Sequence, residues 1–126
     1  MLSGLFSKKE KKEVNWTPLT TVDELKEMNE RSYNRPVLIF KHSTRCAISS
    51  MVINKFESAY QENASFDSFY LDLITYREVS NQIASQYGVV HQSPQAILIS
   101  KGAVVLEDSH NGINFEEIDQ KSREIM

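Results

Sequence analysis

The sequence is poor in the residues from which disulfide-linked, metal-bound and disordered proteins are built. Its 126 residues include one cysteine, Cys46, with three histidines, four glycines and three prolines. One cysteine cannot form an internal disulfide, and a single cysteine with three scattered histidines has no zinc-site spacing. Hydrophobic residues make up 40% and charged residues 25%, which is close to the average of globular proteins and argues against general disorder. We therefore expect a globular domain with no bound metal.

The sequence also lacks a strong excess of one charge and a long apolar run. The formal net charge is -3, which implies no strongly basic surface, so nucleic acid is not an expected partner. The first residues lack the apolar core of a signal peptide, and no apolar run approaches the length of a membrane span. These absences predict a protein of the reducing cytoplasm that has no stable membrane insertion.

The length suits one domain of ordinary size. Residues 1–13 combine three large apolar side chains with a run of lysines and glutamates, and this pattern predicts a flexible charged arm. A transient membrane-surface or partner-docking helix is the alternative for this segment. The folded domain is expected over residues 14–126.

A strand, a turn and a helix between residues 36 and 62 organise the chain. The apolar run Val37–Phe40 predicts a strand that is buried on both faces, and a polar turn follows it. After Cys46 the apolar residues recur at steps of four and predict an amphipathic helix with one apolar face. The residues of this face are Ile48, Val52, Phe56 and Tyr60, with Ile53 beside them.

Cys46 is predicted at the first position of this helix. A thiol there lies among unpaired backbone N–H groups at the positive end of the helix dipole, and both features favour the thiolate. Arg45, directly before it, adds positive charge. The alternative is a small buried hydrophobic side chain, which is the commoner role of a lone cysteine. The turn from a buried strand into a helix favours the functional role, because open α/β sheets place their sites there.

The rest of the chain alternates strands and helices. The predicted order is an edge strand, a helix, the strand before Cys46, its helix, a strand, a helix, two strands joined by a tight turn and a final helix. The predicted ranges of the elements outside the central unit are 14–19, 21–32, 66–73, 77–87, 95–100, 103–108 and 115–124. Crossover helices require parallel pairing in the first half, whereas the tight turn makes the second half antiparallel. The fold class is therefore α/β, with a mixed central sheet flanked by helices on both faces.

Three features of this chain together resemble the thioredoxin fold. Cys46-Ala47-Ile48-Ser49 opens a helix after a strand, Gln92-Ser93-Pro94 leads into a strand, and a hairpin precedes the last helix. The resemblance covers nearly the whole chain after the arm. It implies that Pro94 is the cis-proline that faces the cysteine in this family, and that the Ser93 backbone can dock an extended client or the cysteinyl part of a ligand. Without the resemblance, Ser93-Pro94 would be an ordinary loop that enters a strand.

The motif resembles most specifically that of the monothiol bacilliredoxin-like proteins. Their Thr-Cys-Pro-Ile-Ser motif is matched by the run Thr44-Arg45-Cys46-Ala47-Ile48-Ser49, in which Arg45 stands where Thr is usual and Ala47 where Pro is usual. The resemblance implies a thiol–disulfide oxidoreductase that removes bacillithiol from S-bacillithiolated proteins. Bacillithiol would be a co-substrate, and no tightly bound cofactor is expected. Bacillithiol itself or a partner redoxin or reductase would then clear Cys46.

Ser49 stands where dithiol members have their second cysteine, so this chain has no resolving thiol. Its hydroxyl can donate a weak hydrogen bond to the thiolate, or it can be an ordinary residue of the first helical turn. Bacillithiol ends in a malate with two carboxylates, and the cationic candidates for binding it are Lys41, Arg45 and His110, with Thr44 beside the thiol. The alternatives are a solvated Lys41 and a His110 that packs within its loop.

Two other functions remain open from the sequence. Monothiol glutaredoxins with a Cys-x-x-Ser motif hold an iron–sulfur cluster between two subunits, but the Gly-Phe usual between their Cys and Ser is absent here. The second alternative is an inert thioredoxin-like adaptor in which Cys46 is merely buried. Bound iron would support the first of these, and a Cys46 that resists alkylation would support the second.

Overall fold

A five-stranded sheet in the order β1-β3-β2-β4-β5 forms the centre of the computed structural model, which describes residues 14–126. The strands are β1 (Thr17–Pro18), β2 (Val37–His42), β3 (Asp67–Asp72), β4 (Gln95–Ser100) and β5 (Ala103–Ser109). Both β1 and β2 run parallel to β3, whereas β4 is antiparallel to β2 and to β5. The expected mixed sheet, with its parallel first half and C-terminal hairpin, is confirmed.

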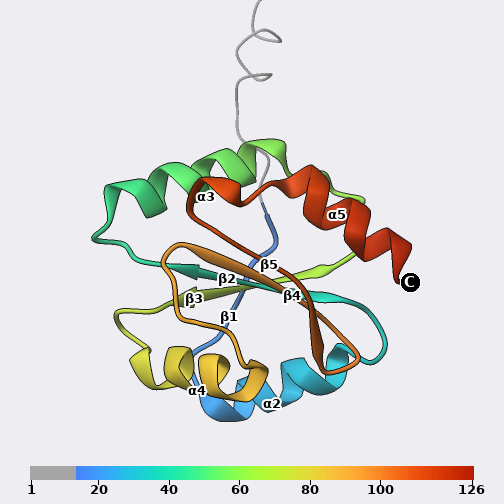
Figure 1. Cartoon of the computed structure of the whole chain (residues 1–126), viewed down its shortest axis with the longest axis horizontal. Helices are drawn as coiled ribbons and strands as arrows, with labels where there is room; N and C mark the ends of the chain where they lie inside the picture. The colour runs from blue at the N-terminus through green and yellow to red at the C-terminus, as the bar shows by residue number, and fades with distance from the viewer. Residues whose placement is uncertain (1–13) are drawn as a thin grey trace, which may run out of the picture.

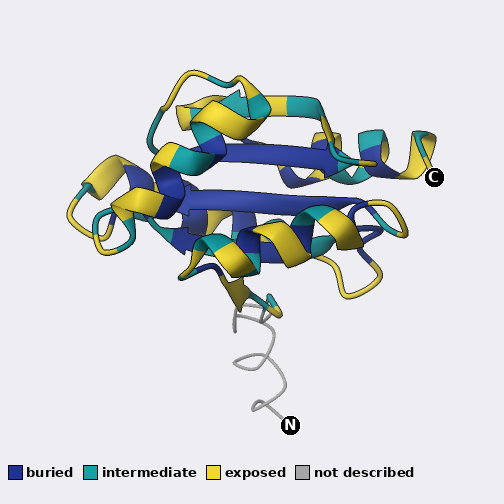
Figure 2. Cartoon of the chain, turned by 90° about the horizontal axis from the view of Figure 1, so that it is seen from below, coloured by how far each residue is buried: buried dark blue, intermediate teal, exposed yellow. Residues whose placement is uncertain are grey.

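Four helices cover the two faces of this sheet (Figure 1). The helices α2 (Val22–Arg31) and α4 (Arg77–Tyr87) lie on one face, and α3 (Ala47–Ala59) and α5 (Phe115–Glu124) lie on the other. Each face has its own apolar core, so β2 and β4 are buried on both sides (Figure 2). This explains why these two strands are continuous apolar runs, whereas edge strands are not.

Local sequence signals set the ends of these elements. The Thr21 side chain accepts a hydrogen bond from the Glu24 N–H and caps α2, and the Asn114 side chain caps α5 in the same way. Gly88 ends α4 with a left-handed φ of 66°. Lys101 and Gly102 also have positive φ, which is the geometry of a tight hairpin turn between β4 and β5.

The structure differs from the sequence predictions at several places. The edge strand expected over 14–19 covers only Thr17–Pro18. Ile48 was expected on the buried face of α3, but 51% of it is exposed. The reason is the rotation of the helix: the buried face of α3 is centred on Ser49, Val52, Ile53 and Phe56, and Ile48 lies at the edge of this face. The expected loop after β5 contains a short 3-10 helix, η1 (His110–Gly112).

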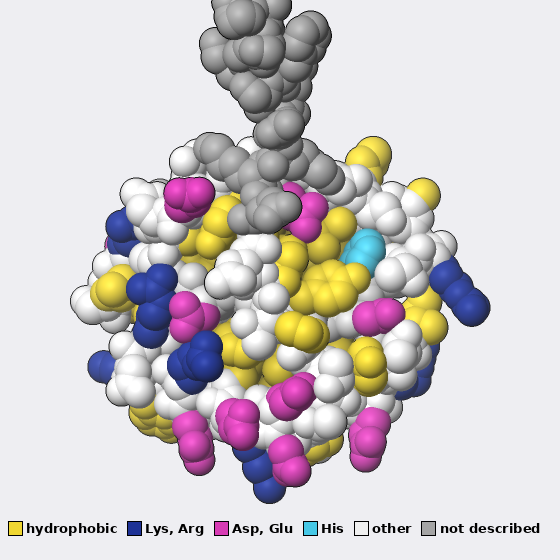
Figure 3. Space-filling view, turned by 180° about the vertical axis from the view of Figure 1, so that it is seen from behind, with side chains coloured by type: hydrophobic (Ala, Val, Ile, Leu, Met, Phe, Trp, Pro, Cys, Tyr) yellow, Lys and Arg dark blue, Asp and Glu magenta, His cyan; other side chains and the backbone are white. Residues whose placement is uncertain are grey.

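The surface of the described part is mixed in character. From the side opposite to that of Figure 1, apolar side chains gather near the middle, between acidic and basic ones (Figure 3). Among residues 14–126, no helix combines the length and the apolar character that crossing a membrane requires. The charged arm predicted for residues 1–13 lies outside the described residues.

Candidate functional site

Cys46 is the N-cap residue of α3, as the sequence predicts. Its backbone is extended, its N–H donates to the Ser43 carbonyl at 3.2 Å, and its carbonyl accepts from the Ser50 N–H at 3.0 Å. Its side chain makes no capping hydrogen bond, and the residue is half-buried. The backbone is thus fixed on both sides, while part of the residue stays exposed to solvent. Partial exposure is what a reactive thiol requires and what the inert-adaptor hypothesis does not predict.

Ser49, one helical turn further on, is completely buried. Its Oγ accepts a hydrogen bond from the Ser43 N–H at 3.1 Å and lies 2.7 Å from Nδ1 of His42. The serine therefore joins the turn before Cys46 to the end of β2. The sequence suggested either a thiolate donor or an ordinary helical residue, and these contacts show that Ser49 has a specific role in the structure of the site.

His42 is a member of this site that the sequence analysis did not identify. It ends β2, is only 7% exposed, and its ring centroid lies 5.8 Å from that of Tyr70. Burial lowers the pKa of His42, although the carboxylates of Asp72 and Glu57 act in the opposite direction. Strand alternation is the signal that could have found it, since it places His42 on the same face as Phe40, beneath α3.

Pro94 lies beside the end of β2, because the neighbouring residue Gln95 pairs with Lys41. The Ser93–Pro94 peptide bond is cis, as the resemblance implies. The Pro94 carbonyl accepts a hydrogen bond from the His110 N–H at 3.0 Å, which joins the cis-proline loop to η1. The Ser93 Oγ is buried and has no hydrogen-bond partner among residues 14–126.

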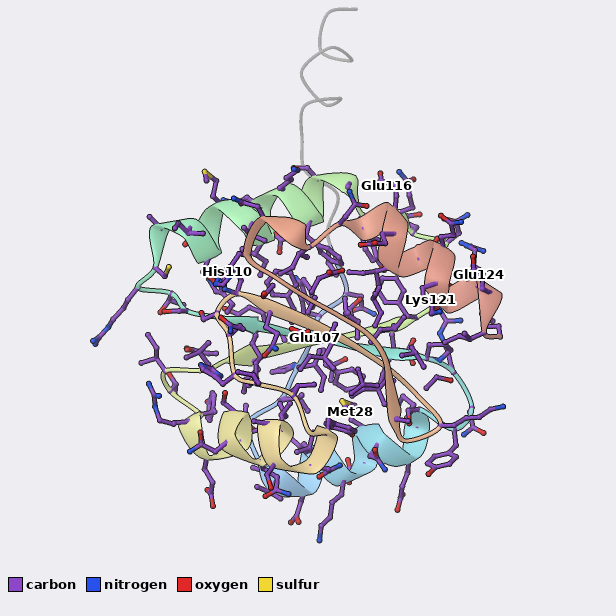
Figure 4. All side chains as sticks on the ribbon, viewed as in Figure 1. Met28, Glu107, His110, Glu116, Lys121 and Glu124 are labelled. Atoms are coloured by element: carbon purple, nitrogen blue, oxygen red, sulfur yellow. The ribbon has the colours of Figure 1, made fainter. Side chains whose placement is uncertain are left out.

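His110 is exposed and has a left-handed φ of 55°. It lies toward the end of the molecule at which α3 begins (Figure 4), and η1 contacts α3 directly. Arg45 and Thr44 are also exposed, in the turn that leads to Cys46. The structure therefore gathers Thr44, Arg45, Cys46, the cis-proline loop and His110 at one end of the sheet.

Lys41 is not part of this surface. It has no exposed area, and strand alternation turns it to the other face of the sheet, toward α4. Its Nζ lies 3.1 Å from Nδ1 of His91, and burial lowers the pKa of Lys41 to about 8. The solvated lysine considered from the sequence is wrong, and Lys41 has no accessible surface for a ligand in this structure.

The described residues also bear on metal binding. Residues 14–126 contain no group of three or more His, Cys, Asp or Glu side chains arranged to hold a metal ion. The expected absence of a metal remains a prediction, because a shared cluster would take ligands from outside this chain.

Comparison with known proteins agrees with this geometry. A family model described as "Monothiol bacilliredoxin BrxC" matches residues 17–118. A solved structure described as a proposed oxidoreductase with a thioredoxin fold is 31% identical, with a TM-score of 0.69 over 82% of this chain and 90% of that chain.

Two thioredoxins show the same fold at lower identity. That of Fasciola hepatica is 18% identical, with a TM-score of 0.64 over 85% of this chain and 96% of its own. That of Schistosoma mansoni is 15% identical, with a TM-score of 0.67 over 88% and 95%. Fold and family together support a redox function. The chain belongs to the monothiol bacilliredoxin BrxC family.

Proposed function

We propose that this protein is a monothiol thiol–disulfide oxidoreductase that removes bacillithiol from S-bacillithiolated proteins. The observation that carries the proposal is the state of Cys46, a half-buried thiol at the start of α3 and the only thiol in the chain. Ser49 stands at the position from which a second thiol would resolve a mixed disulfide. Such a site can accept a cap and hold it, but it cannot release the cap unaided.

The proposed reaction is a single thiol–disulfide exchange. The Cys46 thiolate attacks the bacillithiol sulfur of the mixed disulfide on the client, forming a new S–S bond. The old S–S bond breaks, and the client leaves as a thiolate that takes a proton from solvent. Bacillithiol stays on Cys46 until a second thiol, from free bacillithiol or a partner redoxin, attacks the same sulfur. No tightly bound cofactor takes part in this scheme.

We expect the cap to be recognised by basic side chains that are accessible at the thiol end. Because Lys41 is buried, Arg45 and His110 remain as the candidates at the thiol end that can meet the two malate carboxylates. A charge-assisted hydrogen bond contributes about 1.5 to 3 kcal/mol, or roughly ten- to a hundredfold in affinity. We propose a preference of this order for bacillithiol over glutathione, whose carboxylates are placed differently.

The test uses one client protein with a single cysteine, capped either with bacillithiol or with glutathione. The rate of client-thiol release is measured with the wild type, Cys46→Ser and Arg45→Ala, and with Arg123→Ala as a control at the far end of α5. We expect the wild type to uncap the bacillithiolated client faster, Cys46→Ser to be inactive and Arg45→Ala to lose most of the preference. Release by Cys46→Ser at the wild-type rate would contradict the proposed nucleophile.

The same experiment separates the proposal from its rival. A protein that holds an iron–sulfur cluster would be coloured and contain iron after purification, and it would uncap neither client. Equal rates on the two clients would support a thiol–disulfide oxidoreductase that has no specificity for bacillithiol.

A further inference from the structure

The hydrogen bonds of the Ser49 hydroxyl are limited by its single proton. The Oγ has one hydrogen to donate and two lone pairs to accept with. The Ser43 N–H occupies one lone pair, at 3.1 Å. One lone pair and one hydrogen are left, and His42 Nδ1, at 2.7 Å, takes one of the two.

Cys46 is the neighbour that can take the hydrogen-bonding site of the Ser49 hydroxyl that His42 does not occupy. Cys46 is the N-cap and Ser49 the third residue of α3, so their side chains lie one turn apart on the same face of the helix. Ser49 is completely buried, so water does not compete for its hydroxyl. The serine therefore has two fixed contacts and one hydrogen-bonding site that neither of them uses.

We propose that His42 is a positioning residue for the thiol reaction, and that it acts through Ser49 by holding the proton that Cys46 gives up. The chain of groups is Cys46 Sγ, Ser49 Oγ and His42 Nδ1. This deepens the proposed thiol chemistry of Cys46, but it does not depend on which small thiol caps the client.

The proton transfer balances in two states. In the first state the Cys46 thiol, which makes no hydrogen bond to Ser49 in the structure itself, has turned to donate to Ser49 Oγ, and the Ser49 hydroxyl donates to neutral His42 at Nδ1. In the second state the thiol proton has moved to Ser49, and the serine proton has moved to His42. His42 is then an imidazolium that donates to Ser49, and Ser49 donates to the thiolate. The Ser43 N–H bond is unchanged in both states, so only the Cys46 side chain has to turn.

The surroundings of His42 suit a reversible proton holder. Burial keeps the imidazole neutral in the first state, and it lowers the pKa of His42. The carboxylates of Asp72, at the end of β3, and Glu57, on α3, favour the imidazolium and offset part of that effect. Tyr70 packs against the ring, and because burial raises the pKa of Tyr70 its phenol stays neutral.

The direct test is a titration of the His42 ring nitrogens by NMR, in the free protein and after alkylation of Cys46 with iodoacetamide. Alkylation removes the thiolate that stabilises the imidazolium, and coupling between two sites is reciprocal. We therefore expect the proton affinity of His42 to fall by about threefold or more, which is half a pH unit. His91, on the other face of the sheet, is the control and should not change. An unchanged His42 titration would overturn the proposal.

Substitutions provide a second, independent test. Ser49→Ala and His42→Asn are each expected to slow alkylation of Cys46 at neutral pH by about tenfold, and the double variant should be no slower than the slower single one. The Asn amide can keep a hydrogen bond at the Nδ1 position but cannot hold the proton, so a purely structural role of His42 would leave His42→Asn as fast as the wild type. His91→Asn is the matched control. Effects that multiply in the double variant would show that Ser49 and His42 act separately.

The experiments distinguish a failure of the proton chain from a failure of the proposed uncapping function. If Cys46 does not uncap clients but the His42 titration shifts on alkylation, the proton chain stands and the proposed function falls. If clients are uncapped but the His42 titration does not shift, only the proton chain is wrong.

Discussion

Replacement of Lys41 by methionine should stabilise the protein at neutral pH, and the gain should shrink as the pH rises. Lys41 has no exposed surface, and its charged amine contacts the ring nitrogen of His91 at 3.1 Å. Burial lowers its pKa from 10.5 to about 8, and at 1.36 kcal/mol per unit this is a penalty of about 3 kcal/mol on the folded state when the lysine is charged. Methionine fills a similar volume without a charge.

The sign of the pH dependence follows from the two protonation curves. Below pH 8 both folded and unfolded chains hold the Lys41 proton, so the full penalty is present. Between pH 8 and 10.5 the unfolded chain binds more protons, and stability rises with pH. From pH 7 to 9.5 the deprotonation of Lys41 should raise the free energy of unfolding of the wild type by about 2 kcal/mol. Lys41→Met lacks this change.

The lost contact to His91 offsets part of the gain in the variant. A hydrogen bond to a charged donor contributes about 1.5 to 3 kcal/mol, so the net stabilisation by Lys41→Met at pH 7 should be about 1 kcal/mol. By pH 9.5 the variant should be the less stable protein by about 1 kcal/mol, since the penalty has mostly gone.

Guanidinium chloride unfolding at pH 7, 8, 9 and 9.5, at constant ionic strength, measures this difference. Lys26→Met, on the exposed side of α2, is the control and should show a constant difference from the wild type. A Lys41→Met difference that does not change with pH would refute the reasoning, because it would mean that the buried amine keeps its ordinary pKa.

Three further predictions concern the site and the fold. Ser49→Cys should add a resolving thiol one turn from Cys46, so that a cap placed on Cys46 is released without added thiol, as followed by intact mass over time. Gly102→Ala should destabilise the protein by about 1 to 2 kcal/mol in chemical unfolding, because φ is 77° and the new Cβ would lie 2.6 Å from the Tyr33 hydroxyl. Asp108→Asn should stabilise the protein by about 1 kcal/mol at pH 7, since burial raises the pKa of Asp108 to about 6, and the gain should vanish as the pH falls toward 4. An Asp108→Asn gain that persists at pH 4 would exclude the carboxylate as its source.

The elements whose ends carry local signals were predictable from the sequence. Thr21, Gly88 and Asn114 act through backbone groups within a few residues, so a short window contains the whole interaction. The strand β2 was equally predictable from its apolar run, because a strand between two cores has apolar residues on both faces. Cys46 at the start of α3 followed from these two elements.

What could not be predicted depends on distant contacts. Lys41 and His42 are neighbours that point to opposite faces, and only the packing of α4 and α3 shows that one is buried against His91 and the other against Ser49. Periodicity placed Ile48 on the apolar face of its helix, but its exposure depends on how the helix is rotated against the sheet, which buries Ser49 instead. For Lys41 and His42 the strand pattern was correct, and the partner lay elsewhere in the chain.

The most direct measurement of the central claim is the intact mass of the protein after mixing with one equivalent of a bacillithiolated client. We expect that one bacillithiol is transferred to this chain, that the modified residue is Cys46, and that the adduct persists until a small thiol is added. Recovery of the client with its cap in place, or a cap released to solution without ever appearing on Cys46, would contradict it.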